Sequence, residues 1–329
     1  MAGRFGFTSF VVTEYPFIIS VHSNQAFSQI LTYPCRVVGQ CQSAIAEAIQ
    51  DFHRIDVLLI CKSFTLIGSI EELSQSAHAL SLVRNQFEEN FFAPVNIIKA
   101  TLPHMREKKN GHIIVLTGTT AHLGTPGLGV YCSSQWAIEG YCDSLAYEIA
   151  PFNVKMTIVQ PNLEINVLTN KIVAAPPMPE YAPDVNSAPL AREILSGLLD
   201  RLEGVPPSSI DQTPATASAS SPTDVSTGDT PVSPGVTGMV GDAENVLTTG
   251  ELLSASTVTE VYPPLEPGLN SALIAETVFA IAAIGGHDNP PARHIVGVEG
   301  VLSVKEKLKT ISEELEDFIE VSFGVDITK

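Results

Sequence analysis

The residue best suited to chemistry in this chain is Tyr131, which stands near the start of a segment with helical spacing. Apolar residues recur along that segment at Trp136, Ile138, Tyr141, Leu145 and Ile149. A loop rich in Gly, Thr and Pro precedes it from Thr117 to Gly129, and an apolar run of strand length precedes the loop from Ile113 to Leu116. A strand, a loop of small residues and a helix presenting a phenol near its first turn favour a site where a proton is exchanged with substrate. We therefore expect a redox site in this stretch.

The elements that would position this site alternate between strands and helices. Strand-like runs are expected at 7–13, 17–21, 54–60, 113–116, 154–160 and 290–297, and helical patterns at 43–52, 82–105, 131–149, 188–202, 269–284 and 304–321. Such an alternation predicts an α/β fold with a doubly wound parallel sheet, because parallel strands need crossover helices that cover both faces.

One segment interrupts this pattern. From 204 to 262 the chain is dominated by Ser, Thr, Pro, Gly, Asp and Val, with almost no aromatic residues. Such a composition buries too little apolar surface to offset the entropy of ordering, so we expect a disordered insertion. Its Thr-Pro and Ser-Pro pairs at 230–234 are either phosphate acceptors or parts of a passive linker. The rest, 1–203 and 263–329, is expected to form a single domain, with 1–40 as a divergent N-terminal part.

Composition narrows the function classes. The net charge of −18 disfavours nucleic acid and anionic membranes as partners, because both carry negative charge. No apolar run is long enough to span a membrane, and no signal peptide is recognisable. The five cysteines form no CxxC pair, which favours reduced thiols and a cytoplasmic location. The histidines lack metal-binding spacing, so no metal site is expected.

Several stretches resemble the short-chain dehydrogenase/reductase family. Tyr131-Cys132-Ser133-Ser134-Gln135, behind a strand that ends in Val115-Leu116-Thr117-Gly118, resembles the family's active-site segment. Residues 54–58 resemble its fourth strand, 89–96 and 102–105 the following helix, and 290–297 its final strand. The resemblance covers about 41–172 and 269–302. It implies a Rossmann-like doubly wound sheet that binds NAD or NADP.

The resemblance also implies roles for single residues. Tyr131 matches the family's general acid/base, and Asn90 matches a helical asparagine that supports a proton-relay water; a capping or surface asparagine is the alternative. Four residues after the tyrosine, the family has a lysine that lowers the tyrosine pKa, and this chain has Gln135. Without a nearby cation, a phenol keeps a pKa of about 10, so Tyr131 can donate a proton but is a poor base at neutral pH.

The family's substrate-polarising serine is also replaced. Thirteen residues before the tyrosine, the serine position is occupied by Gly118, which has no side chain. Thr117 and Thr119 are the neighbouring hydroxyls that would have to substitute for it.

Cofactor binding rests on weaker matches. The family's glycine-rich turn brings backbone N–H groups to the diphosphate at a helix N-terminus, and no such motif precedes residue 56. The family's Asn-Asn-Ala-Gly stretch is Ile60-Cys61-Lys62-Ser63 here, and its later Pro-Gly is Pro161-Asn162. If NADP or NAD binds, we expect contacts from Lys62, Ser63, Pro161 and Asn162. A solvated loop lysine is the alternative for Lys62.

Three interpretations therefore stay open. The chain is a degenerate member of the family, a pseudoenzyme that keeps the fold and acts as a binding, regulatory or scaffold protein. Alternatively, it is an active NAD(P)H-dependent carbonyl reductase or alcohol dehydrogenase that uses Tyr131 on a small apolar substrate. A third interpretation is that the stretch 1–34 is incorrectly predicted and a normal nucleotide-binding unit stands in its place. The resemblance further implies a homodimer through the Tyr131 helix, with Trp136 and Tyr141 in the core or the interface.

Overall fold

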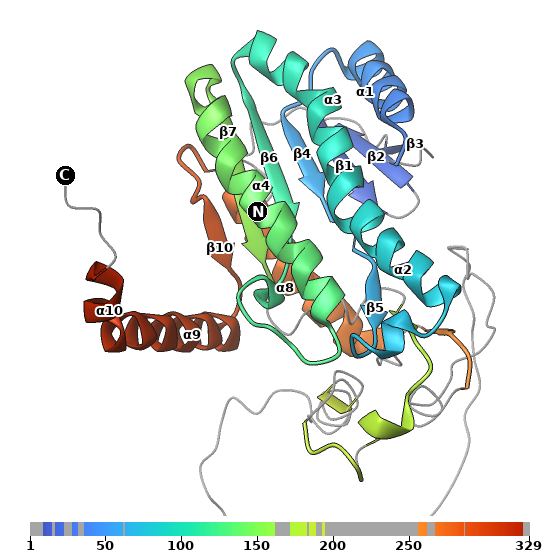
Figure 1. Cartoon of the computed structure of the whole chain (residues 1–329). Coiled ribbons are helices and arrows are strands. Elements are labelled where there is room, and N and C mark those ends of the chain that lie inside the picture. Colours follow the sequence, from blue (N-terminus) through green and yellow to red (C-terminus); the bar gives the residue numbers. More distant parts are fainter. Residues whose placement is uncertain are drawn as a thin grey trace, which may run out of the picture.

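The computed structural model describes residues 9–14, 17–22, 28–31, 36–61, 63–161, 172–182, 184–188, 193–194, 256–261, 267–285 and 287–324. Its main feature is a seven-stranded sheet in the order β10-β7-β6-β4-β1-β2-β3 (Figure 1). The strands are β1 (Ser9–Glu14), β2 (Phe17–His22), β3 (Ser28–Leu31), β4 (Val57–Ile60), β6 (Gly111–Leu116), β7 (Val154–Gln160) and β10 (Arg293–Ile295). The strands β10, β7, β6, β4 and β1 are parallel to one another. The predicted α/β class and Rossmann-like sheet are confirmed.

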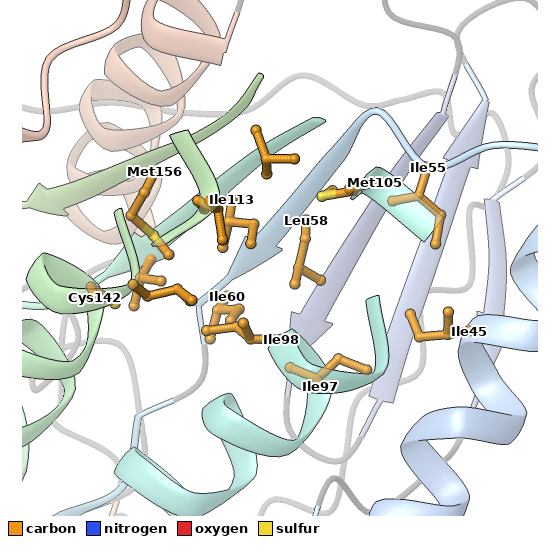
Figure 2. Packing of buried hydrophobic residues seen from close by; sticks show 14 of the residues in the cluster. Ile45, Ile55, Leu58, Ile60, Ile97, Ile98, Met105, Ile113, Cys142 and Met156 are labelled. Atoms are coloured by element: carbon orange, nitrogen blue, oxygen red, sulfur yellow. The ribbon is translucent and has the colours of Figure 1, made fainter. Parts of the chain in front are cut away.

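Helices cover both faces of this sheet. On one face lie α1 (Val38–Phe52), α3 (Ala93–Lys108) and α4 (Gly129–Ile149), and α8 (Pro267–Gly285) lies on the other (Figure 1). Successive strand residues point to opposite faces, so each strand feeds two separate cores. Leu58, Ile60 and Ile113 enter the core under α1, α3 and α4 (Figure 2), whereas Val57 and Ile114 enter the core under α8.

The N-terminal strands depart from a doubly wound sheet. β1 runs parallel to β4, but it pairs with β2 in antiparallel fashion, with Glu14 opposite Phe17. β2 and β3 are antiparallel as well. The chain therefore reverses direction directly after β1, and the first described helix, α1, begins only after β3. The expected strands near 7–13 and 17–21 exist, and the expected divergence of the first unit takes the form of a hairpin.

The helical pattern expected over 82–105 is confirmed, and a π-helical turn divides it. α2 (Ala77–Phe87) leads into a π-helical turn (Glu88–Phe92), and α3 follows. The hydroxyl of Ser76 caps α2 by accepting a hydrogen bond from Ala79 N at 3.0 Å. π-helical turns inside helices are frequent at functional sites, and this one carries Asn90.

A small second sheet and two C-terminal helices lie outside the main sheet. A small second sheet of β5 (Thr65–Ile67), β8 (Ile172–Ala174) and β9 (Thr259–Val261) was not expected. β9 lies inside the range 204–262 expected as an insertion, so ordered structure resumes before 262; residues 204–255 lie outside the described residues. After β10, α9 (Val298–Asp317) and α10 (Ile319–Phe323) replace the single helix expected over 304–321, and α9 extends away from the sheet (Figure 1). No helix in the described part of the chain is long and apolar enough to cross a membrane.

Candidate active site around Tyr131

Tyr131 lies in the first turns of α4 and is completely buried. The loop before it is fastened to the end of β5, because Gly68 N donates a hydrogen bond to Gly127 O at 2.9 Å. Gly127 has φ 77°, a conformation that favours glycine. At Gly129 a Cβ atom would lie 3.2 Å from the side chain of Ile70. The loop and β5 thus close tightly over the start of α4, and the phenol is enclosed by protein.

The structure places the residues at the family's lysine and serine positions, and the threonines beside the serine position, as follows. Gln135 is buried on α4, one helical turn after Tyr131, where its neutral amide supplies no positive charge. Gly118 follows β6 in an extended conformation, with φ −156° and ψ 170°, which a serine can also adopt. Thr119 is buried in the short 3-10 turn that follows. Thr117 donates its hydroxyl hydrogen to Glu139 Oε1 at 2.6 Å, so this hydroxyl is committed to a carboxylate.

Glu139 is the centre of a buried polar cluster that sequence reasoning missed. Besides Thr117, its carboxylate accepts hydrogen bonds from Gln160 Nε2 at 2.6 Å and from Arg293 at 3.0 and 3.2 Å. His122 Nε2 lies 3.2 Å from Gln160 Oε1. These residues join α4 to β6, β7 and β10, so the cluster ties the helix of Tyr131 to the sheet. The available signal was a pair of opposite charges, Glu139 and Arg293, in segments otherwise expected to be apolar.

Arg293 is held in its charged form by this cluster. Burial lowers the pKa of the guanidinium, but Glu139 and Asp143 outweigh burial and raise the pKa above its ordinary value. The guanidinium reaches both carboxylates, Glu139 at 3.0 Å and Asp143 at 3.1 Å. The buried carboxylate of Glu139 is therefore compensated by a fixed cation and by neutral donors.

Asn90 connects three segments. Its amide nitrogen donates to Phe64 O at 2.9 Å and to Ser134 Oγ at 3.2 Å, and its amide oxygen accepts from Phe64 N at 2.7 Å. Gln86 holds the same stretch by accepting from Leu66 N at 2.8 Å and donating to Phe64 O. Both amides thus pin the chain after β4 against the helices. The suggested role of Asn90 in a proton relay stays a prediction.

Comparison with known proteins identifies a similar family. Residues 20–172 match the family model described as short chain dehydrogenase. Over this stretch the chain is similar to that family. It is 33% identical to human retinol dehydrogenase 8 over 144 residues, which are 44% of this chain and 43% of that protein. It is 35% identical to the 3-ketodihydrosphingosine reductase of Bacteroides thetaiotaomicron over 120 residues, which are 36% of this chain and 43% of that protein.

These matches concern part of each protein. The chain spans 43% of the length of both curated relatives. A crystal structure of a short-chain dehydrogenase from Streptomyces avermitilis is similar over 90% of this chain and 81% of that chain, with a TM-score of 0.57 and 19% identity. At that identity the likeness concerns the fold alone. The family match begins at residue 20, inside β2, so β1 and the turn after it lie outside the match.

The dinucleotide expected for a short-chain dehydrogenase does not fit the described residues. Its diphosphate needs a helix N-terminus directly after the first strand, and here β1 turns into the antiparallel strand β2. Of the expected contacts, Lys62 and Asn162 lie outside the described residues. Pro161 is buried directly after β7, and Ser63 is buried with no partner for its hydroxyl among the described residues. One hydroxyl does not replace a set of backbone N–H donors.

Metal binding has no visible basis in the same parts of the chain. Among the described residues, no group of three or more His, Cys, Asp or Glu side chains is placed to hold a metal ion.

Proposed function

We propose that this protein is a short-chain dehydrogenase family member that does not transfer hydride and acts as a binding or regulatory protein. The observation that carries the proposal is the reversal of the chain between β1 and β2. Because Glu14 pairs with Phe17, no helix can begin at the carboxyl end of β1. The anion-binding helix terminus on which nicotinamide dinucleotides depend is absent from that point of the sheet.

The residues around Tyr131 support the proposal independently. Losing a general acid–base aid costs about 10²–10⁴ in rate, and losing one oxygen-stabilising donor costs about 10²–10³. Gln135 and Gly118 stand at those two positions. Groups that act as a unit do not contribute additively, so these factors are not multiplied. The commitment of Thr117 to Glu139 leaves Thr119 as the remaining neighbouring hydroxyl that could replace the missing serine.

Retention of Tyr131 favours a second candidate function, a carbonyl reductase in which the phenol donates a proton. By their names, the two relatives act on retinol and on 3-ketodihydrosphingosine. Apolar alcohols and ketones are therefore the substrate class to test against this chain. The same class is the ligand expected if the protein has become a binding protein.

Titration calorimetry of the full chain with NADH and with NADPH tests the proposal. We expect no heat of binding for either cofactor, with human retinol dehydrogenase 8 as a positive control for the reagents. Micromolar binding, together with carbonyl-dependent oxidation of the reduced cofactor that disappears in Tyr131→Phe, would support the reductase and exclude our proposal.

A rebuilt site gives a stricter test. The double variant Gly118→Ser with Gln135→Lys restores both missing side chains, and the extended backbone at Gly118 accepts a serine. We expect this variant to fold and to show no turnover, because the β1–β2 hairpin is unchanged. Measurable reduction of a retinal or ketone panel by the double variant would mean that the cofactor still binds, and the proposal would fail.

A further inference from the structure

Helix α9 carries an apolar stripe that continues beyond the body of the protein. The helix follows β10 and extends away from the sheet (Figure 1). Apolar side chains recur alternately three and four residues apart along one side: Val301, Val304, Leu308, Ile311, Leu315 and Phe318. This is the heptad spacing with which helices pair side by side, each apolar side chain filling a gap in the facing helix.

Only the first part of this stripe is covered by its own subunit. Val304 is 4% exposed, whereas Leu308, Leu315 and Phe318 are 56%, 66% and 65% exposed. Within the described parts of the chain, nothing covers these three side chains. A contiguous apolar stripe on a projecting helix is a feature of interaction surfaces, because leaving it in water is costly.

The charges that flank the stripe identify the partner. Lys305, Lys307 and Lys309 lie around the midpoint of α9, with Glu306 among them, and Glu313, Glu314, Glu316 and Asp317 follow toward its end. The acidic residues at that end oppose the helix dipole, which favours cations near the C-terminus. Within the helix, an ion pair of 3.7 Å between Lys309 and Glu313 offsets part of this cost. A second α9 running in the opposite direction brings further lysines beside the acidic end.

We propose that α9 pairs with α9 of a second copy of this chain in antiparallel orientation. With the twofold axis beside residues 309 and 310, Leu308 faces Ile311 of the other copy. The same register brings Leu315 and Phe318 of each copy beside the first part of the other copy's α9, where Val304 is already covered by its own subunit. On one flank, Lys307 faces Glu314 of the other copy, and symmetry repeats this ion pair.

A parallel arrangement lacks this complementarity. In that orientation the flanking position of Lys307 faces Ser312, and that of Glu314 faces Ile319. The acidic ends of the two helices would also lie side by side, which is unfavourable. The antiparallel pair therefore has the better electrostatics, and its seam continues directly from Val304, which is already packed on its own subunit.

This surface is separate from α4, the helix through which the family resemblance suggested a dimer. On α4, Trp136 is 54% and Tyr147 is 84% exposed. The α9 pairing needs neither residue and does not depend on whether the protein transfers hydride.

Sedimentation velocity of the full chain at about 1 to 100 µM tests the pairing. We expect a dimer that Leu308→Glu converts to a monomer with an unchanged circular dichroism spectrum. The matched control is Leu302→Glu, which changes a 59% exposed leucine on the other side of the same helix and should leave the dimer intact. A wild-type monomer at the highest concentration, or equal effects of the two variants, overturns the proposal. So does dissociation by Trp136→Glu with a dimer that survives Leu308→Glu.

Charge reversal tests the orientation. Lys307→Glu or Glu314→Lys alone places like charges opposite each other twice per dimer, and we expect each to weaken dimerisation about tenfold. The double variant restores opposite charges across the antiparallel seam and should recover wild-type affinity. Single variants without effect, or a double variant no tighter than the singles, would contradict the antiparallel pairing.

Discussion

The two halves of the large sheet are held by different means. β4, β6, β7 and β10 are parallel strands with buried polar contacts: Glu139 on α4 accepts from Gln160 of β7 and from Arg293 of β10, and His112 of β6 contacts Thr157 of β7. β1, β2 and β3 form an antiparallel meander, and β1 joins this meander to the rest of the sheet by pairing in parallel with β4. In the short-chain dehydrogenases, the first half positions the catalytic tyrosine and the second half positions the cofactor. In this chain the parallel half is present, and β1 is followed by the antiparallel strand β2.

The two halves differ in how consecutive strands are connected. A parallel neighbour for β1 needs a crossover helix, whereas an antiparallel one needs only a short turn. The ladder along β4 is satisfied in either case, because β1 itself is still parallel to β4. The pairing between β1 and β4 is thus the same whichever direction the next strand takes.

The sharpest test of this contrast compares one ion pair from each side of the molecule. Arg293 compensates the buried carboxylate of Glu139, and Arg36, before α1, contacts the buried carboxylate of Glu89. We expect Arg293→Ala to lower the free energy of unfolding by about 3–5 kcal/mol, because it leaves Glu139 buried among neutral donors only. Arg36→Ala should cost less, about 1–3 kcal/mol: the Glu89 side chain is 4% exposed, but removal of the 42% exposed Arg36 side chain opens its carboxylate to solvent.

Urea denaturation of both variants measures the two values. Asp143→Ala is the control, because it removes the exposed partner of Arg293 and leaves the pair with Glu139. Equal losses in the free energy of unfolding for Arg293→Ala and Arg36→Ala would mean that the two ion pairs stabilise the protein to the same extent, so that the two halves would not differ in this respect.

Asn90 gives the next largest effect. Asn90→Ala removes the partners of both Phe64 N and Phe64 O and of the hydroxyl of Ser134. Unsatisfied buried backbone groups cost about 1–3 kcal/mol each, and Gln86 still reaches Phe64 O, so we expect a loss of about 2–3 kcal/mol in unfolding free energy. Asn85→Ala, a change in a more exposed neighbour, should be nearly neutral. A negligible loss for Asn90→Ala would leave its suggested relay role as the better explanation of the residue.

Particular residues show how far the sequence could predict this molecule. The apolar runs at 57–60, 113–116 and 154–160 indicated the parallel core, because buried strands carry a local signal. The direction of β2 relative to β1 has no such signal: an apolar run predicts a strand, and its partner decides its orientation. Glu139 and Arg293 are 154 positions apart, so only the fold brings them together. The π-helical turn at Asn90 is invisible to periodicity, because apolar spacing continues through it.

The smallest of these effects is a pH dependence confined to the parallel half. Burial, helped by the charge of Lys155, lowers the pKa of His112 from 6.5 to about 4. Thr157 donates its hydrogen to Pro291 O at 2.8 Å and lies 2.9 Å from His112 Nε2, which favours the neutral tautomer with the proton on Nε2. The folded protein therefore binds this proton less readily than the unfolded chain. The stabilising contribution is complete above the unfolded pKa of 6.5 and is lost as the pH falls toward 4.

Between about pH 7.5 and pH 5, this linkage should remove about 2 kcal/mol from the free energy of unfolding. His112→Gln keeps a donor for Thr157 and does not titrate. Over the same interval, the free energy of unfolding of this variant should therefore fall by about 2 kcal/mol less than that of the wild type. Urea denaturation at the two pH values measures the difference, with His53→Gln, an exposed histidine at the end of α1, as the matched control. Parallel pH profiles for wild type and His112→Gln would mean that burial does not lower the pKa of His112 in the folded protein. The interior of the parallel half would then be more accessible to protons than the burial of His112 indicates.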